Sequence, residues 1–183
     1  GKITENLGYR VYSAIKALYH VKKKGFDVNI LIAGKIDNNV IEKTYKLAQR
    51  LNVKQNINYL GPYSQREAPK VYQKANAFLM LKYLDPCPNT VIEAMACGLP
   101  VLYSKSGGIR ELVSESCGIG LPVKQDWNAS FIVPKSNIIA EGIIKIIKNY
   151  KDLSENSRKV AVKKFNLENW ISRHETIFKK YLD

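Results

Sequence analysis

Five short apolar runs alternate along this chain with longer segments of helical periodicity, and this alternation limits how the chain can fold. The runs are Val28–Ala33, Ile57–Leu60, Ala77–Leu81, Val101–Tyr103 and Ile119–Val123. Each is too short for a helix and mostly apolar, as strands buried on both faces of a sheet are. Parallel strands need a crossover connection, which is usually a helix. The sequence therefore predicts an α/β fold with a doubly wound, Rossmann-like parallel sheet.

The segments between and after these runs carry the apolar spacing of amphipathic helices. Apolar residues recur at that spacing from Leu7 to Leu18, which predicts a helix over residues 7–24. Further helices are expected over residues 38–52, 69–75, 88–97, 109–115, 139–150, 152–164 and 167–181. Because the chain opens directly into a helix, we expect a βα unit that has been trimmed at its first strand.

The two tryptophans, Trp127 and Trp170, are expected to be packing groups. Trp170 lies at core spacing with Leu167 and His174 on the last expected helix. A histidine on such a face is more often structural than catalytic, so His174 is not a candidate for catalysis.

The length and composition are those of one ordinary domain. The 183 residues are 45% apolar, which is enough for a substantial core, and we expect residues 1–183 to form a single domain. No apolar stretch approaches the roughly 20 residues of a membrane-spanning helix. The three cysteines include no C-x-x-C pair, which favours reduced thiols in a cytoplasmic protein and gives no basis for a zinc site.

The formal net charge is +13, from 29 Lys and Arg against 16 Asp and Glu. Such an excess favours anionic partners, among them phosphorylated substrates, anionic lipid surfaces and nucleic acid. A lysine-rich, solvated surface without a dedicated partner explains the same composition. We do not expect nucleic acid as a partner, because the lysines are spread along the chain and no recognition motif accompanies them.

In doubly wound sheets, ligands bind at the carboxyl ends of the strands. The turns to consider are those at Gly34, Gly61–Pro62, 84–89 and 104–108. Gly34 permits a close backbone approach and Lys35 can reach a phosphate, while the turn at Pro62 and Tyr63 can meet the edge of a base. Plain surface turns explain these residues as well, so both interpretations stay open from the residues alone.

Two acids stand around the turn that opens the helix expected over residues 88–97. Asp85 follows the strand that ends at Leu81, and Glu93 lies eight positions later on the helix. Both should face one cleft, where Asp85 can hold a hexose hydroxyl or polarise the reacting centre, and Glu93 can accept hydrogen bonds from a ribose. Thr90 and Glu93 also fit a capping box, in which Glu93 would serve only its own helix.

The start of the same helix offers a place for a phosphate. The backbone N–H groups of Asn89, Thr90 and Val91 lie where a helix leaves its donors free and where its dipole favours an anion. Every helix has such an end, so the feature decides nothing alone. The turn at Gly107–Gly108 can let the backbone approach a ligand, or it is a plain loop into the next helix.

Several enzyme classes lose support because their motifs are missing. The sequence has no Ser-His-Asp order, no P-loop lysine motif and no H-E-x-x-H. It also lacks G-x-G-x-x-G, so a nicotinamide or flavin cofactor is not expected.

A longer pattern connects the residues between Leu81 and Val113. It consists of Asp85 and Glu93, then Ala94-Met95-Ala96-Cys97-Gly98-Leu99-Pro100-Val101, then Ser104, Gly107-Gly108 and Glu111. This segment resembles the donor site of retaining GT-B glycosyltransferases of family 4, the glycosyl transferases group 1. Their pattern is two acids eight positions apart, A-M-A-x-G-x-P-V, and S-x-x-G-G-x-x-E. The resemblance covers nearly the whole chain, but only the C-terminal, donor-binding half of the two-domain enzyme.

The resemblance implies roles for these residues. Glu93 would bind the donor ribose, Asp85 would lie near the transferred sugar, and the amides of residues 89–91 would hold the diphosphate. The turn at Pro62 and Tyr63 would meet the base. The reaction would retain the anomeric configuration and would need no metal ion or other cofactor.

Two departures from the family pattern matter. The first acid is usually Glu, and Asp85 is one methylene shorter, in a D-P-C-P-N turn that we interpret as a subgroup trait affecting the choice of sugar. The family also places an Arg or Lys and a further Lys before its first helix, against the diphosphate. Lys2 is a remnant of the first, whereas Glu5 or Leu7 occupies the place of the second.

Two functions of different classes follow. The first is the donor-binding domain of a glycosyltransferase that transfers a hexose from a UDP-, GDP- or ADP-sugar to a saccharide or lipid-linked acceptor. Such a domain needs an N-terminal acceptor domain as its partner, so this chain alone should bind donor weakly and transfer nothing. The second is a non-catalytic nucleotide-sugar-binding or interaction module. In either case we expect a cytoplasmic protein, peripheral to the inner face of the membrane if its basic surface meets anionic lipid.

Overall fold

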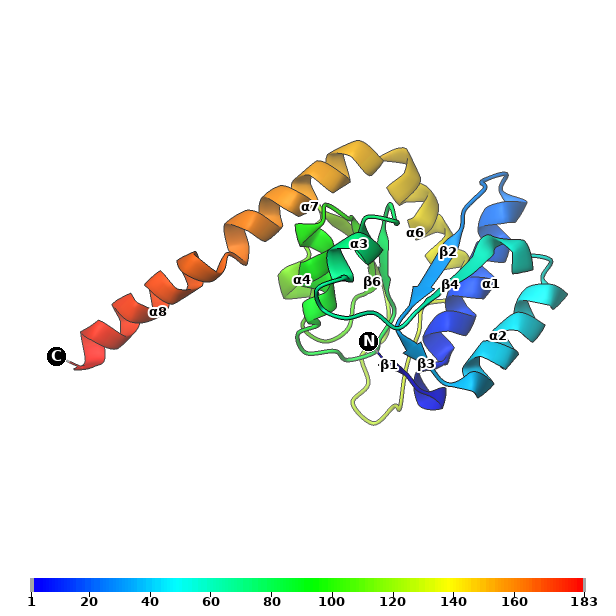
Figure 1. Cartoon of the computed structure of the whole chain (residues 1–183), viewed down its shortest axis with the longest axis horizontal. Coiled ribbons are helices and arrows are strands. Elements are labelled where there is room, and N and C mark those ends of the chain that lie inside the picture. Colours follow the sequence, from blue (N-terminus) through cyan, green and yellow to red (C-terminus); the bar gives the residue numbers. More distant parts are fainter. Residues whose placement is uncertain (1, 183) are drawn as a thin grey trace.

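Parallel strands flanked by helices form the body of the protein, a computed structural model of which describes residues 2–182 (Figure 1). The strands are β1 (Lys2–Ile3), β2 (Ile30–Ala33), β3 (Lys35–Ile36), β4 (Ile57–Gly61), β5 (Phe78–Met80), β6 (Val101–Ser104) and β7 (Gly118–Leu121). The helices are α1 (Tyr9–Lys23), α2 (Asn38–Arg50), α3 (Ala68–Tyr72), α4 (Asn89–Ala96), α5 (Ile109–Leu112), α6 (Ser136–Lys148), α7 (Tyr150–Lys164) and α8 (Leu167–Leu182), with short 3₁₀ turns over Glu5–Leu7 and Lys54–Asn56. All strand pairs among residues 2–182 are parallel. The α/β prediction is therefore confirmed.

The strand pairing is interrupted between β2 and β5. β1 pairs with β3, β2 pairs with β4, and the remaining strands form a unit in the order β5-β6-β7. β3 follows β2 directly after Gly34, which has a φ of 120°. The N–H of Gly34 donates to the carbonyl oxygen of Gly61 at 2.8 Å, and this bond joins the turns that end β2 and β4.

β1 provides a short strand ahead of α1, where the sequence indicated only a helix. Lys2 lies opposite Lys35 in parallel register, and the N–H of Asp37 donates to the carbonyl oxygen of Ile3 at 3.0 Å. The helix expected from residue 7 begins instead at Tyr9, because the preceding residues form a 3₁₀ turn. β1 therefore lies at the carboxyl end of β2, where the strand-end turns converge.

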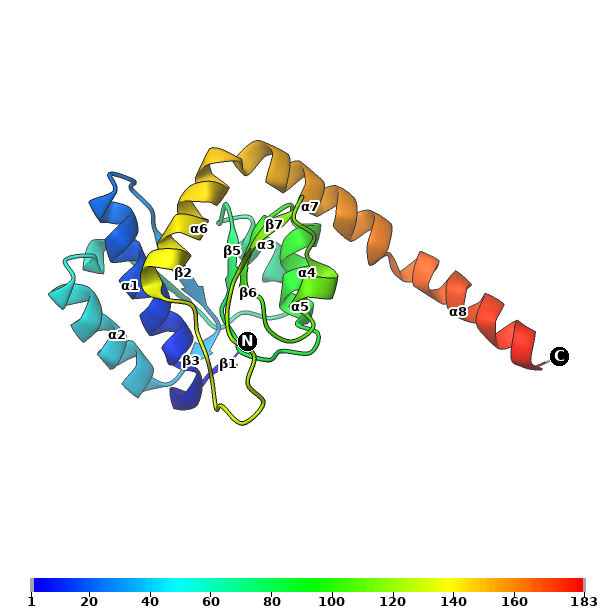
Figure 2. The ribbon, with the colours of Figure 1, turned by 180° about the vertical axis from the view of Figure 1, so that it is seen from behind.

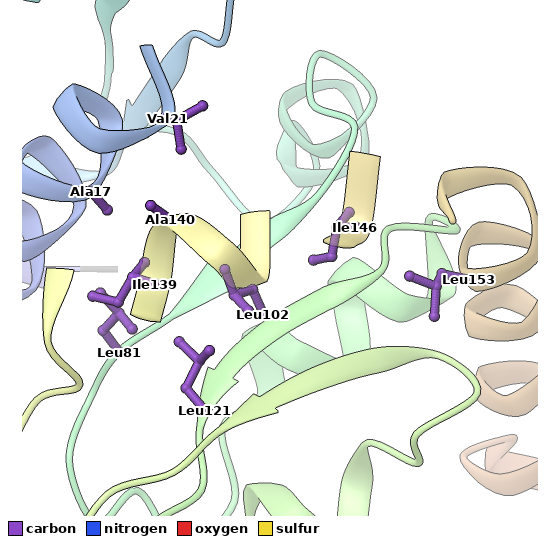
Figure 3. Packing of buried hydrophobic residues seen from close by; sticks show 9 residues of the cluster. All are labelled: Ala17, Val21, Leu81, Leu102, Leu121, Ile139, Ala140, Ile146 and Leu153. Carbon is purple, nitrogen blue, oxygen red and sulfur yellow. The ribbon is translucent and has the colours of Figure 1, made fainter. Parts of the chain in front are cut away.

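The core that supports the strands is divided into clusters on the two sides of the sheet. One of them joins α1 and α6 to β6 and β7, and Figure 3 shows its buried residues: Ala17, Val21, Leu81, Leu102, Leu121, Ile139, Ala140, Ile146 and Leu153. A β-carbon on Gly142 of α6 would lie 2.5 Å from Cδ1 of Leu102, so this glycine lets α6 pack closely on β6. A second cluster lies between β6, α4 and α7. The carboxyl ends of the strands thus extend from a rigid base.

Helix α8 extends away from the body of the molecule (Figures 1 and 2) and has no buried residue. The expectation that Trp170 packs in a core with Leu167 is wrong, because these side chains are 51% and 67% exposed. Trp170 stacks instead on His174, with ring centroids 3.8 Å apart. Trp127 is 76% exposed and is not a packing group either. Helical spacing predicts an apolar face, but whether that face is covered depends on other elements.

Removing α8 should leave the stability of the body nearly unchanged, because no residue of this helix is buried. A chain that ends at Asn166 is expected to lose less than about 1 kcal/mol in its free energy of unfolding. Ile139→Ala, the control, opens a cavity in the core and should cost about 2–5 kcal/mol. Urea unfolding followed by circular dichroism measures both values, and a loss on truncation as large as that of Ile139→Ala would show that α8 packs on the body.

Candidate functional site

A cavity of about 1180 Å³ opens at the carboxyl ends of β2 and β5 and continues between the two strands. Its polar wall includes Arg10, Tyr63, Lys82, Asp85, Asn89 and Thr90. Four of the residues singled out from the sequence, Tyr63, Asp85, Asn89 and Thr90, therefore line a single cavity. Residues from distant turns meet here because the carboxyl ends of parallel strands lie at the same edge of a sheet.

The turn after β5 holds Asp85 in a fixed position. The side chain is largely buried, and its Oδ2 accepts a hydrogen bond from Nζ of Lys82 at 2.8 Å. Leu84 has a φ of 50°, a left-handed conformation that residues with a β-carbon seldom adopt. The N–H of Leu84 donates to Oγ of Ser106 at 3.2 Å. This bond offsets the unfavourable backbone conformation and sets the direction in which Asp85 leaves the strand.

The Gly107–Gly108 turn packs directly on the backbone of Asp85 and Pro86. The N–H of Gly108 donates to the carbonyl oxygen of Asp85 at 3.0 Å. A β-carbon on Gly107 would lie 2.4 Å from the carbonyl oxygen of Asp85, and one on Gly108 would lie 1.9 Å from that of Pro86. From the sequence alone, this turn could either let the backbone approach a ligand or be a plain loop into the next helix. The structure shows that these glycines allow the turn after β6 to approach the turn after β5.

Glu93 bonds to α3 and does not cap its own helix. Its Oε2 accepts a hydrogen bond from the hydroxyl of Tyr72 at 2.8 Å, and no side chain of the described structure caps the start of α4. The capping box considered for Thr90 and Glu93 is therefore not formed. Burial, together with the Glu93 carboxylate, raises the pKa of the Tyr72 hydroxyl well above its usual value. Tyr72 thus remains a donor at neutral pH, and it connects Glu93 to the cavity wall that Tyr72 borders.

The N-terminal turn of α4 presents backbone donors to the mouth of the cavity. The N–H of Val91 already donates to the carbonyl oxygen of Pro88 at 2.9 Å, and the Val91 side chain is completely buried. The N–H groups of Asn89 and Thr90 have no acceptor within the helix, since they belong to its first turn. Both residues border the cavity. An anion at this place would meet two amides and the positive end of the helix dipole.

Two cations that the sequence analysis did not single out lie with Asp85 at the cavity mouth. Lys82 forms the ion pair described above, and its spacing of three residues from Asp85 was visible in the sequence. Arg10, on the first turn of α1, borders the cavity, and its Nε donates to the carbonyl oxygen of Leu7 at 3.3 Å. Burial lowers the pKa of the Arg10 guanidinium, and Tyr9 and Asp85 oppose that effect. An arginine keeps its charge under such shifts, so the mouth carries positive charge.

The remaining candidates lie beside the cavity without bordering it. Gly34 is buried, whereas Lys35 and Pro62 are exposed. The hydrogen bond from Gly34 to Gly61 brings these turns to the same rim as Tyr63, which does border the cavity.

Residues able to hold a metal ion do not gather in the described part of the chain. No three His, Cys, Asp or Glu side chains within residues 2–182 form such a group. The cysteines of this range form no disulfide: Cys87 is exposed, Cys97 is half-buried and Cys117 is buried. Burial raises the pKa of the Cys97 thiol, which makes this thiol a poor nucleophile at neutral pH.

Comparison with known sequences gives one family and distant relatives. Residues 9–161 match the family model described as Glycosyl transferases group 1. The chain is 26% identical over 168 residues to a probable sucrose-phosphate synthase of Thermosipho melanesiensis, and the alignment covers 86% of this chain and 35% of that relative. The chain therefore spans about a third of the length of this relative.

Comparison with solved structures gives the same fold. The crystal structure of Anabaena Alr3699/HepE in complex with UDP matches with a TM-score of 0.74 at 19% identity, over 92% of this chain and 44% of that one. The C-terminal domain of a glycosyl transferase group 1 family protein, LpcC from Francisella tularensis, matches with a TM-score of 0.71 at 19% identity, over 91% and 84% of the two chains. The fold is thus the Rossmann-like C-terminal half of a GT-B fold.

Gly108→Ala should displace the loop that carries Asp85. Gly108 has a φ of −85°, which alanine accepts, so only the contact with Pro86 opposes the substitution. We expect the free energy of unfolding to fall by about 1–3 kcal/mol. Urea unfolding measures this loss, and amide NMR shifts at Leu84 and Asp85 should report the displacement.

The matched control is Gly25→Ala, where φ is 82° and nothing lies within 4 Å of the added carbon. Backbone strain alone should cost about 1–2 kcal/mol there, without shifts at Leu84 or Asp85. A Gly108→Ala protein that kept both its stability and the shifts of the Asp85 loop would contradict the close approach.

Proposed function

The chain belongs to the glycosyl transferases group 1 family, and from this membership we propose that it is the donor-binding domain of a retaining glycosyltransferase. The complete enzyme transfers a hexose from a nucleotide sugar to a saccharide or lipid-linked acceptor. The observation that supports this best is the combination, in one cavity mouth, of a buried carboxylate, two cations and the free amides of a helix start. A sugar joined to a diphosphate offers hydroxyl groups and negative charge to these same groups.

In this proposal the donor diphosphate lies at the start of α4. The N–H groups of Asn89 and Thr90 donate to its oxygens. The N–H of Val91 can join them only by giving up its hydrogen bond to the carbonyl oxygen of Pro88. Arg10 and Lys82 offset the negative charge. UDP in the crystal structure of HepE, which has this fold, supports a nucleoside diphosphate as the ligand.

The nucleoside lies toward the rim formed by the turns after β2 and β4. Glu93, oriented by the Tyr72 hydroxyl, accepts hydrogen bonds from the ribose. Pro62 and Tyr63 meet the base. Gly34 permits a close approach at the same rim, and Lys35 can reach a phosphate from there. These assignments rest on the resemblance of the motif and on the common location of the turns.

Asp85 lies beside the transferred sugar. Its carboxylate pairs with the Lys82 ammonium and can accept hydrogen bonds from sugar hydroxyl groups. As the bond between the sugar and the diphosphate breaks, charge develops on the departing oxygen. Fixed N–H groups and the nearby cations stabilise that charge without rearranging. We therefore propose transfer without a metal ion. We also propose retention of the anomeric configuration, which the NMR spectrum of the product tests.

The acceptor site belongs to a second domain. The chain spans 35% of the sucrose-phosphate synthase and 44% of HepE. We propose that an N-terminal domain supplies the acceptor site across the cavity mouth. This chain alone then binds donor weakly and transfers nothing.

A non-catalytic nucleotide-sugar-binding module is the second candidate function. The family's second cation before the first helix is replaced here by Glu5 or Leu7, and this replacement favours the alternative. Joining the chain to its N-terminal half and measuring hydrolysis of the donor separates the two functions. The transferase releases the nucleoside diphosphate, whereas the module leaves the donor intact.

Glu93→Ala should remove most of the affinity for the donor, because hydrogen bonds to a carboxylate are lost. Calorimetric titration with UDP, GDP, ADP and their sugar forms first identifies the nucleotide that binds. We expect the substitution to weaken that binding by about tenfold or more. Glu115→Ala, at an exposed site away from the cavity, is the control and should bind as the unchanged chain does. If Glu93→Ala bound the nucleotide as tightly as the unchanged chain, Glu93 would not be the residue that binds the ribose.

Arg10→Gln should weaken binding of the diphosphate and not of the nucleoside. The guanidinium acts on charge, so the affinity for a nucleoside diphosphate should fall by about tenfold at low salt, with less effect at high salt. The unphosphorylated nucleoside should bind equally to both proteins. Lys46→Gln, on the exposed face of α2, controls for the loss of overall charge. A matching loss in this control would mean that net charge, and not Arg10, attracts the ligand.

We further propose a cytoplasmic enzyme that contacts anionic lipid at the inner face of the membrane. The charge of +13 and the exposed apolar and basic side chains of α8, such as Phe178 and Lys179, support this contact. No helix within residues 2–182 is both long and apolar enough to cross a membrane. Cosedimentation with phosphatidylglycerol vesicles is expected and should fall as salt rises. Equal binding to phosphatidylcholine vesicles would contradict the electrostatic contact.

A further inference from the structure

A second cavity lies away from the candidate donor site, near the place where α8 follows α7 (Figure 2). Its volume is about 540 Å³, which is within the range of about 300–1,000 Å³ that small-molecule sites occupy. Residues of α5, α7 and α8 line it, and none of them lines the cavity at the carboxyl ends of β2 and β5. A ligand bound here would therefore occupy a site separate from that of the proposed donor.

Positive charge dominates the walls of this second cavity. The basic residues that line it come from three helices and are Arg110, Lys163, Lys164 and Arg173. No ion pair joins any of them to an acid within residues 2–182, although Glu111 also lines the cavity. Four cations near a single carboxylate repel one another, and an anion bound among them would offset that repulsion. The cavity thus favours a ligand with more than one negative charge.

The packing of α5 on α7 fixes two walls of the cavity. Ile109 of α5 and Ala161 of α7 are buried in one hydrophobic cluster, and Leu112 packs against it. Nζ of Lys164 donates a hydrogen bond to the carbonyl oxygen of Glu111, which joins the end of α7 to α5. The cations of these two helices are therefore attached to elements that cannot separate without opening the core.

Local hydrogen bonds hold the start of α8, which carries Arg173. The N–H of Asn169 donates to Oδ1 of Asn166 at 3.1 Å, and the N–H of Trp170 donates to the carbonyl oxygen of Asn166 at 3.1 Å. Nε of Arg173 donates to the carbonyl oxygen of Asn169 at 3.2 Å. The terminal nitrogens of the guanidinium are then left as donors for a ligand.

The types of residue in this cavity suit a phosphate group. The guanidinium groups of Arg110 and Arg173 present planar sets of N–H donors that match phosphate oxygens, and Lys163 and Lys164 add charge. A phosphate monoester carries a charge of about −1.5 to −2 at neutral pH, whereas a carboxylate carries a single charge. The monoester therefore offsets more of the repulsion among the four cations.

We propose that the cavity between α5, α7 and α8 binds a phosphate monoester, which is carried by a small soluble compound or by the headgroup of a phospholipid. Arg110 and Arg173 bind the phosphate oxygens, and Lys163 and Lys164 offset the charge. The inference goes beyond the donor-binding function and holds whether or not that function does, because the two cavities have no residue in common.

Two variants that lose the same charge test this site. The cavity variant is Arg110→Gln with Arg173→Gln, and the control variant is Lys46→Gln with Arg50→Gln on α2. All four side chains are exposed, so both variants should unfold at nearly the same urea concentration as the unchanged chain.

Amide NMR spectra recorded during titration with glycerol 3-phosphate measure binding of a soluble monoester. In the unchanged chain and in the control variant, the amides of Glu111, Ser114 and Lys163 should shift together. In the cavity variant, the Kd read from these amides should be about tenfold higher. Any shift at Asn89 and Thr90 belongs to the candidate donor site and should be the same in both variants.

Cosedimentation with vesicles of phosphatidylcholine and phosphatidic acid tests the phospholipid headgroup. If the lipid is the source of the phosphate, the cavity variant should bind these vesicles about tenfold more weakly than the control variant does. If a soluble compound is the source, the two variants should bind the vesicles equally while glycerol 3-phosphate still distinguishes them.

The proposal would be overturned if neither glycerol 3-phosphate nor the vesicles distinguished the cavity variant from the control variant. The net charge of the chain would then explain any binding. A failure of the donor proposal looks different, because the Asn89 and Thr90 amides would stay unchanged during titration with UDP, GDP and ADP. That result would leave the comparison of the cavity and control variants as it is.

Discussion

The contact between two backbone turns, Gly107–Gly108 and Asp85–Pro86, fixes the geometry on which the site depends. These turns follow the neighbouring strands β6 and β5, and they meet so closely that neither glycine has room for a β-carbon. The hydrogen bond from Gly108 to the Asp85 carbonyl and that from Leu84 to Ser106 hold the turns together. Because α4 starts shortly after Pro86, the same contact places the helix start beside Asp85. The Asp85 carboxylate and the amides that we propose to bind phosphate are thus positioned by one feature of the backbone.

The sequence predicted the main strands well because short apolar runs between helices can form few structures other than buried strands. It could not predict how the strands pair, since pairing depends on which edges meet in space, and the interruption between β2 and β5 leaves no mark on periodicity. The same limit explains Trp170: its spacing predicts an apolar face on α8, but no described element covers that face. β1 was missed because two residues carry no periodic signal.

In the candidate site, too, some residues could be predicted from the sequence and others could not. Asp85, Asn89 and Thr90 follow from the rule that the strand ends of a parallel sheet converge, and they line one cavity. The partner of Glu93 did not follow, because Tyr72 is distant in the sequence and a local capping box fitted equally well. Arg10 was also not predicted as a site residue, since its position depends on how α1 packs. Arg10 supplies positive charge at the cavity mouth, where the resemblance to the family implies that Glu5 or Leu7 stands in place of a second cation.

We propose above all that a nucleoside diphosphate binds at the start of α4. Amide NMR spectra recorded during titration with UDP, GDP and ADP in turn test it most directly. We predict that one nucleotide shifts the Asn89 and Thr90 amides most strongly, with smaller shifts at Glu93 and Tyr63 and none along α2 or α8. Shifts spread over the exposed lysines, with the α4 amides unchanged at saturation, would contradict it.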